Sequence, residues 1–123
     1  MTPHFSVAEL RCKCDCGMLP KLDFMQRIES LRLKYGKPMR VTSAARCPEY
    51  NARVSSTGLT GPHTTGRAID FGIQGNDAHY LLELAMEAGF TGIGVNQKGD
   101  GRFLHVDDLP NAPGQPRPWV WSY

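Results

Sequence analysis

The chain has 123 residues, 41% of them hydrophobic and 21% charged, which is an ordinary composition for one globular domain spanning residues 1–123. Its net charge is only +2, and Lys and Arg are scattered among acidic residues, which argues against a dedicated nucleic-acid binder. No apolar run approaches the roughly 20 residues that a membrane-spanning helix needs, and the first residues lack a secretory signal pattern. We therefore expect synthesis in the cytoplasm without a signal peptide.

Local patterns predict the elements of the first half of the chain. The sequence Ser-Val-Ala-Glu at residues 6–9 is a capping box, which predicts a short helix that ends near residue 11. Apolar residues at helical spacing predict a long helix over residues 21–35. A strand is expected over residues 39–43 and a short helix over residues 46–54.

The second half alternates between loops and short elements. We expect a loop over residues 55–65, a strand over residues 68–73, a helix capped by Asn76 or Asp77 that runs to residue 88, strands over residues 91–95 and 102–107, and an irregular Pro- and Trp-rich tail from about residue 110. Because the strands are short and irregularly connected among helices, the predicted fold class is α+β, with a small, mainly antiparallel sheet flanked by helices.

Two separate segments carry residues that suit a metal ion. His63 and Asp70 lie seven residues apart, and Gly66 between them can reverse the chain. His105 lies in the middle of the last predicted strand. Two imidazoles and one carboxylate are a ligand set that leaves the fourth position of a catalytic zinc open for water. Each residue alone has an ordinary structural explanation, so only their combination favours a metal site.

These segments also resemble a known family. Gly61-Pro-His-Thr-Thr-Gly-Arg-Ala-Ile-Asp70 is similar to the Ser-x-His-x-x-Gly-x-Ala-x-Asp signature of zinc peptidases that cut bacterial cell-wall peptides, with glycine in place of the serine. Phe103-Leu-His-Val-Asp107 resembles their aromatic-x-His-x-Asp strand. These D-Ala-D-Ala carboxypeptidases and L-alanyl-D-glutamate endopeptidases share the Hedgehog/DD-peptidase fold, and the chain resembles a small phage-type member over about residues 5–109. The resemblance implies that His63, Asp70 and His105 bind Zn²⁺.

The general base is not assigned by this resemblance. Many relatives carry an acid or a histidine just upstream of the last ligand, whereas this chain has Arg102 and Phe103 there. Asp107 is the first candidate for the base, because alternate residues of a strand share a face and it lies two residues after His105. The alternative is that Asp107 orients a ligand imidazole through the free ring nitrogen.

A further segment is similar to the family pattern Ser-x-x-Arg-x-x-x-x-Asn. It places Ser43, Arg46 and Asn51 in that order. The resemblance implies that Arg46 binds a substrate carboxylate or the developing oxyanion, which suits a permanently charged guanidinium fork, and that Ser43 and Asn51 help to bind substrate. A surface ion pair between Arg46 and Glu49 is the alternative.

Four cysteines occupy positions 12, 14, 16 and 47. Paired zinc ligands are usually two to four residues apart, so the one-residue gaps fit a metal site poorly. Without a secretory signal, reduced thiols are the default. Structural or incidental thiols, a disulfide to Cys47 and a bound metal all stay open at this stage.

Together these observations predict a zinc metallopeptidase that hydrolyses an amide bond in the peptidoglycan stem peptide, as a carboxypeptidase or endopeptidase. We expect a monomer that acts on the cell wall after phage-type release, as an endolysin does. The alternative is a non-catalytic, zinc-stabilised domain of the same fold that binds the wall or belongs to a virion. The missing base upstream of His105 favours that alternative.

Overall fold

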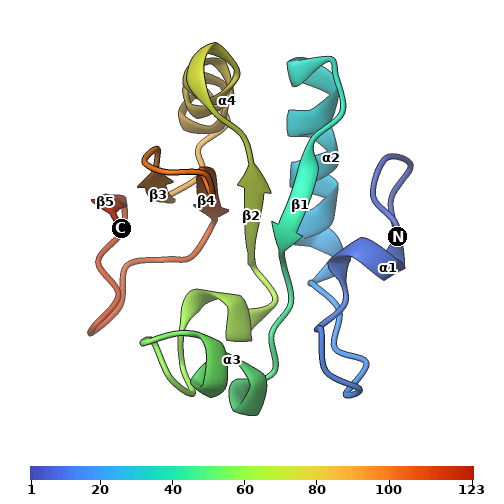
Figure 1. Ribbon diagram of the computed structural model, residues 1–123, viewed down its shortest axis with the longest axis vertical. Helices are drawn as coiled ribbons and strands as arrows, with labels where there is room; N and C mark the ends of the chain where they lie inside the picture. The colour runs from blue at the N-terminus through green and yellow to red at the C-terminus, as the bar shows by residue number, and fades with distance from the viewer.

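The computed structural model describes residues 1–123 as helices and a single sheet (Figure 1). In chain order the elements are α1 (Val7–Leu10), α2 (Leu22–Tyr35), β1 (Arg40–Ser43), α3 (Pro48–Val54), the 3-10 helix η1 (Pro62–Thr65), β2 (Ala68–Gly72), α4 (Gly75–Glu87), β3 (Gly92–Asn96), β4 (Phe103–Asp107) and β5 (Trp119–Ser122). None of the helices has both the length and the apolar character needed to cross a membrane.

The helix ends follow local chemistry, with one correction. The predicted capping box opens α1, since the Ser6 hydroxyl accepts from the Glu9 N–H while the Glu9 carboxylate accepts from the Ser6 N–H. Gly36 ends α2 in the left-handed conformation, with φ of 82°. The prediction that Asn76 or Asp77 caps α4 is wrong, because this helix begins earlier and its N-cap is Gln74, which makes no side-chain cap hydrogen bond.

The five strands form one sheet in the order β1-β2-β4-β3-β5. Every neighbouring pair is antiparallel except β3 and β5, which are parallel, so the predicted α+β class with a mainly antiparallel sheet is confirmed. The sequence analysis missed β5. Backbone hydrogen bonds from Trp119 N–H to the Thr91 carbonyl, 2.8 Å, and from Tyr123 N–H to the Val95 carbonyl, 3.2 Å, hold this strand on the edge.

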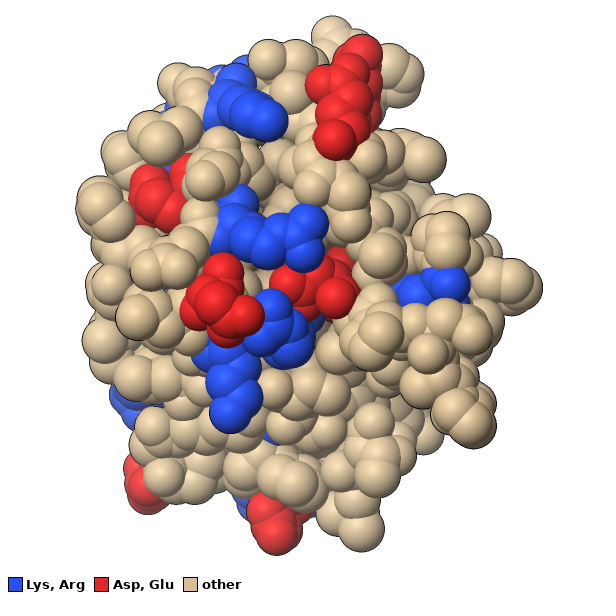
Figure 2. Space-filling view, turned by 180° about the vertical axis from the view of Figure 1, so that it is seen from behind, with Lys and Arg blue, Asp and Glu red and all other residues tan.

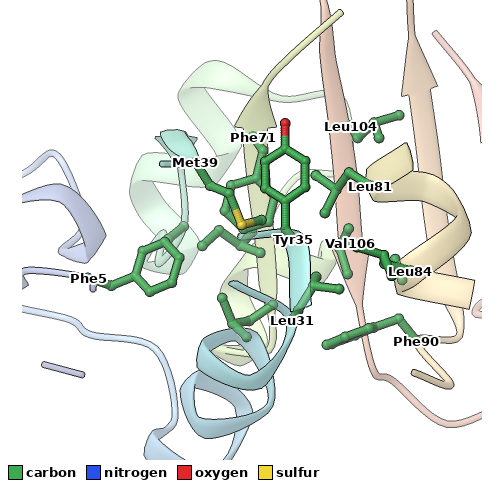
Figure 3. Packing of buried hydrophobic residues seen from close by; sticks show 14 of the residues in the cluster. Phe5, Leu31, Tyr35, Met39, Phe71, Leu81, Leu84, Phe90, Leu104 and Val106 are labelled. Atoms are coloured by element: carbon green, nitrogen blue, oxygen red, sulfur yellow. The ribbon is translucent and has the colours of Figure 1, made fainter. Parts of the chain in front are cut away.

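Strand alternation divides the sheet into an apolar and a polar face. Ile69 and Phe71 of β2 and Leu104 and Val106 of β4 are almost completely buried in a cluster of 19 residues. Figure 3 shows side chains from α2, α4, β2 and β4 meeting in this cluster. The intervening residues of the same strands therefore point to the opposite face, where the polar side chains lie.

One row of residues crosses the polar face of the sheet. The register pairs Ser43 of β1 with Asp70 of β2, Asp70 with His105 of β4, His105 with Gly94 of β3, and Gly94 with Trp121 of β5. A Cβ atom on Gly94 would lie 2.7 Å from the Trp121 indole nitrogen. Only a glycine in this position lets the indole lie beside the imidazole, so the row brings polar and aromatic groups together.

Charged side chains on the outside of the fold form ion pairs. On the side seen in Figure 2, blue and red side chains lie next to one another. Arg67 pairs with Asp108 at 2.8 Å and with Asp23 of α2 at 2.9 Å, while Arg27 of α2 also contacts Asp108 at 3.1 Å. These pairs tie α2 to the segments before β2 and after β4.

Two leucines on α2 test the assignment of the core. Leu31 is 1% exposed, whereas Leu33, two residues later, is 62% exposed. We expect Leu31→Ala to lower the free energy of unfolding by about 2–5 kcal/mol, because it leaves a cavity in the cluster. Leu33→Ala should change it by less than about 0.5 kcal/mol. Urea unfolding measures both, and equal losses would contradict the assigned core.

Candidate metal centre

A tight turn brings His63 close to Asp70. His63 lies in η1, and Gly66 ends that helix. The φ of Gly66 is 76°, a left-handed backbone conformation that residues other than glycine rarely adopt. The chain then enters β2, which carries Asp70. As a result, His63 Nε2 lies 3.2 Å from Asp70 Oδ1, although seven residues separate them.

The third predicted ligand comes from the neighbouring strand. His105 Nδ1 lies 3.0 Å from Asp70 Oδ1 because Asp70 and His105 are paired in the β2–β4 register. The three side chains are buried, and one donor atom from each lies within 4.8 Å of the others. Donors around one tetrahedral zinc with bonds of about 2.0–2.2 Å lie about 3.3–3.6 Å apart. The set His63, Asp70 and His105 therefore fits Zn²⁺.

Hydrogen bonds on the outer side of each imidazole orient the rings. His63 Nδ1 lies 2.6 Å from the Ala44 carbonyl oxygen, which can only accept, so this nitrogen carries the proton. His105 Nε2 lies 2.7 Å from Asp107 Oδ2 and donates to that carboxylate. The remaining nitrogens, Nε2 of His63 and Nδ1 of His105, both face Asp70 and are the ring atoms that would bind a metal ion. This is the arrangement that supports metal-binding histidines.

Asp107 is fully buried, and both of its carboxylate oxygens accept hydrogen bonds from protein groups. Arg117 forms a forked pair with it, Nε to Oδ1 at 2.9 Å and Nη2 to Oδ2 at 2.8 Å. Oδ2 also accepts from His105, and Oδ1 accepts from the Leu109 N–H at 3.3 Å. A carboxylate held by these donors has no free oxygen for a water. The contacts therefore favour the orienting role for Asp107 over the general base.

The comparison with known families agrees with this geometry. The sequence matches Peptidase M15 over residues 3–107, a range that contains His63, Asp70, His105 and Asp107. The chain belongs to the Peptidase M15 family. Membership implies a metallopeptidase, and M15 peptidases are zinc-dependent. A search of curated proteins finds no match.

The charges of this M15 peptidase favour a cation at the centre. Burial by itself raises the pKa of the Asp70 carboxyl, but hydrogen bonds and charges from His105 and His63 outweigh it and hold the pKa well below its ordinary value. Burial likewise raises the pKa of Asp107, whereas His105 and Arg117 lower it below the ordinary range. Both carboxylates are therefore ionised at neutral pH, one facing the centre and one behind it.

Arg46 reaches the same centre from the other side. Its Nε donates to Ser43 Oγ at 2.9 Å, its Nη1 donates to Asn51 Oδ1 at 3.1 Å, and its Nη2 lies 3.6 Å from Asp70 Oδ2. The ion-pair partner of Arg46 is thus Asp70, not Glu49. The M15 segment that contains Ser43, Arg46 and Asn51 folds as one hydrogen-bonded unit around the guanidinium.

Asn51 is the most deeply buried of these three residues. Its side chain is fully buried, and its amide nitrogen donates to Thr57 Oγ1 at 2.8 Å and to the Gly58 carbonyl at 2.6 Å. The buried amide has protein partners for both its oxygen and its nitrogen. These contacts favour a supporting role for Asn51, beneath Arg46 and the loop after α3, over the predicted role in substrate binding.

The centre forms the floor of an open cleft of about 720 Å³. One wall comes from the loop between α3 and η1, and the other from the tail, through residues 114–117 and the aromatic residues of β5. Trp121 lies beside His105, with ring centroids 5.0 Å apart, and Tyr123 lies beside Phe103 at 4.8 Å. The sequence analysis missed Arg117 and Tyr123 as site residues. The alternation of aromatic residues at 119, 121 and 123 was the available signal for this strand.

Metal content tests the ligand set. We expect His63→Ala and His105→Ala each to lose one equivalent of tightly bound zinc, because two remaining ligands do not make a stable site. His79→Ala is the matched control, since His79 is exposed on α4 and should leave the zinc content unchanged. Elemental analysis after dialysis measures this. Full zinc content in either ligand variant would rule out the proposed centre.

The role of Asp107 makes a separate prediction. Loss of a carboxylate that orients a ligand imidazole typically costs about 10–100-fold in metal affinity. We expect Asp107→Asn to weaken zinc binding by that factor, as measured by competition with a chelator. A general base would behave differently: the variant would bind zinc normally and lose turnover.

Proposed function

We propose that this M15 peptidase hydrolyses an amide bond in the stem peptide of peptidoglycan. The observation that carries the proposal is a three-ligand centre that borders an open cleft, with Arg46 beside it. An open position next to three protein ligands is the hallmark of a catalytic rather than a structural zinc site. Action on the wall after phage-type release is part of the same proposal.

The candidate metal centre and Arg46 would have different roles in the reaction. When bound, Zn²⁺ supplies Lewis-acid chemistry, which acidifies a water and polarises a scissile carbonyl. Arg46 has five N–H groups, of which three are directed at Ser43, Asn51 and Asp70. The other two are left for a substrate carboxylate or the developing oxyanion. Because its fork is already held in place, little reorganisation is needed when charge develops.

The walls of the cleft suit a peptide that combines small apolar side chains with carboxylates. Trp119 and Tyr123 are 55% and 50% exposed and offer apolar surface on the tail side. Arg46 offers positive charge at the floor. A stem peptide presents alanine methyl groups and free carboxylates along an extended chain, so it matches both features. An open groove also admits a peptide that is still attached to a polymer.

One observation favours a second candidate, a zinc-stabilised domain that binds the wall without cutting it. Asp70 has the only carboxylate side chain among the residues that line the cleft, and it is already a predicted zinc ligand. The two imidazoles in the cleft are ligands as well. No free acid or histidine is therefore in position to take a proton from water. We rank this candidate second because Arg46 has the preorganised geometry that an oxyanion requires.

The deciding experiment is digestion of purified peptidoglycan. We expect the zinc-loaded protein to release fragments whose masses and new termini, read by mass spectrometry, identify one amide bond. A chelator should abolish their release. Zinc-loaded protein that pellets with walls of several peptidoglycan types and releases no fragment would establish the binding domain instead.

Arg46 provides a variant that separates chemistry from metal binding. We expect Arg46→Ala to lower turnover about 10²–10³-fold, the usual cost of removing one preorganised oxyanion donor, while zinc content stays unchanged. Arg53→Ala is the matched control, because Arg53 is exposed on α3 and lies outside the cleft. Turnover of Arg46→Ala equal to that of the control would remove Arg46 from the mechanism.

A further inference from the structure

A second group of metal-binding side chains lies apart from the cleft. Cys12, Cys14 and Cys16 come from the loop after α1, and Cys47 comes from the connection between β1 and α3. All four are free thiols. Their sulfur atoms lie within 4.8 Å of one another, and the Cys14 Sγ atom is 3.5 Å from the Sγ atoms of Cys12 and Cys47. The four thiols will be called the cysteine cluster.

The spacing of the sulfur atoms matches a metal site better than a disulfide. Sulfur atoms around a tetrahedral zinc with Zn–S bonds of about 2.3 Å lie about 3.8 Å apart. The 3.5 Å separations in the cysteine cluster are close to that value. A disulfide joins two sulfurs at about 2.05 Å and would leave no reason for the other two to gather at the same point.

Backbone N–H groups point at three of the four sulfurs. The Cys47 N–H donates to Cys12 Sγ at 3.3 Å, the Tyr50 N–H donates to Cys47 Sγ at 3.4 Å, and the Met18 N–H donates to Cys16 Sγ at 3.4 Å. A sulfur that accepts hydrogen bonds is stabilised as the thiolate, the form that binds metals. These donors form an outer layer like that of a built metal site.

We propose that the cysteine cluster is a structural Zn²⁺ site with four thiolate ligands. Four protein ligands leave no open position for water, which distinguishes this site from the His63–Asp70–His105 centre. Four sulfur ligands in a tetrahedral arrangement are typical of zinc and iron–sulfur sites and do not suit hard ions such as Mg²⁺ or Ca²⁺. The one-residue gaps between the first three cysteines are accommodated because the loop folds back on itself, with the Cys12 N–H donating to the Met18 carbonyl at 2.9 Å.

The position of the cysteine cluster suits a structural role for the zinc. Cys47 directly follows Arg46, and the neighbouring Ala45 N–H donates to the Leu10 carbonyl of α1 at 3.2 Å. The same connection supplies the Ala44 carbonyl that orients His63. Zinc in the cysteine cluster would therefore clip the N-terminal loop to the segment that positions Arg46 and His63. Because such metal binding contributes to folding free energy, its loss should also destabilise the protein.

The test uses the full chain with the other centre removed. In the double variant His63→Ala/His105→Ala, prepared under reducing conditions, we expect one equivalent of zinc per chain, compared with two in the wild type. Replacing zinc with Co²⁺ should give the intense thiolate-to-cobalt charge-transfer absorption of a sulfur-ligated tetrahedral site. Adding Cys47→Ser to the double variant should remove that absorption, whereas adding Asp15→Ala, an exposed position in the same loop, should leave it.

Thiol reactivity provides a readout that does not depend on any variant being folded. In the zinc-loaded wild type, we expect the four thiols to react slowly with a thiol reagent. Their reaction rate should rise when a chelator is added. The proposal is overturned if the double variant holds no metal and shows no charge-transfer absorption, or if a chelator leaves thiol reactivity unchanged. Either result leaves the proposed peptidase intact, because peptidoglycan digestion tests the His63–Asp70–His105 centre separately.

Discussion

The pairing of Asp70 with His105 across β2 and β4 is the constraint on which the rest of the site depends. A slip of β4 by one residue against β2 would turn His105 into the apolar core and bring Leu104 and Val106 out of it. The buried cluster on the other face of the sheet resists such a slip, because the apolar residues of the slipped strand would leave it. Hydrophobic packing by α2 and α4 thus sets the position of two candidate metal ligands on the opposite face of the sheet.

Around this pair the fold adds supporting contacts from the tail, from β4 itself and from the connection after β1. Arg117 from the tail holds Asp107, Asp107 holds His105, and the Ala44 carbonyl holds His63. Gly92 contributes by lacking a side chain, since a Cβ atom there would collide with both Asp107 oxygens. The edge strand β5 is therefore part of the site. It pairs with β3 at the edge of the sheet, and with the tail segment before it, residues 114–117, it lines the cleft beside the centre.

The connection between β1 and α3 joins the two candidate metal sites. Together with Ser43 at the end of β1, it carries the carbonyl that orients His63, and then Arg46 and Cys47. Its backbone is hydrogen-bonded both to α1 and to η1, through Ala45 N–H to Leu10 and Arg46 N–H to His63. A rigid segment here explains how a small domain with a short sheet can hold a guanidinium and an imidazole in fixed positions around one point.

The sequence by itself determined the features that depend on neighbouring residues. Periodicity and caps located α2, β2 and β4, and the two motifs with their order indicated the family and the candidate ligands His63, Asp70 and His105. Local pattern could not decide the role of Asp107, the presence of β5 or the meeting of four cysteines, because each depends on contacts between segments distant in the chain. Arg117 pairs with Asp107 ten residues away, and Cys47 meets Cys12 across 35 residues. Such contacts follow from how the elements pack, so only the tertiary structure decided them.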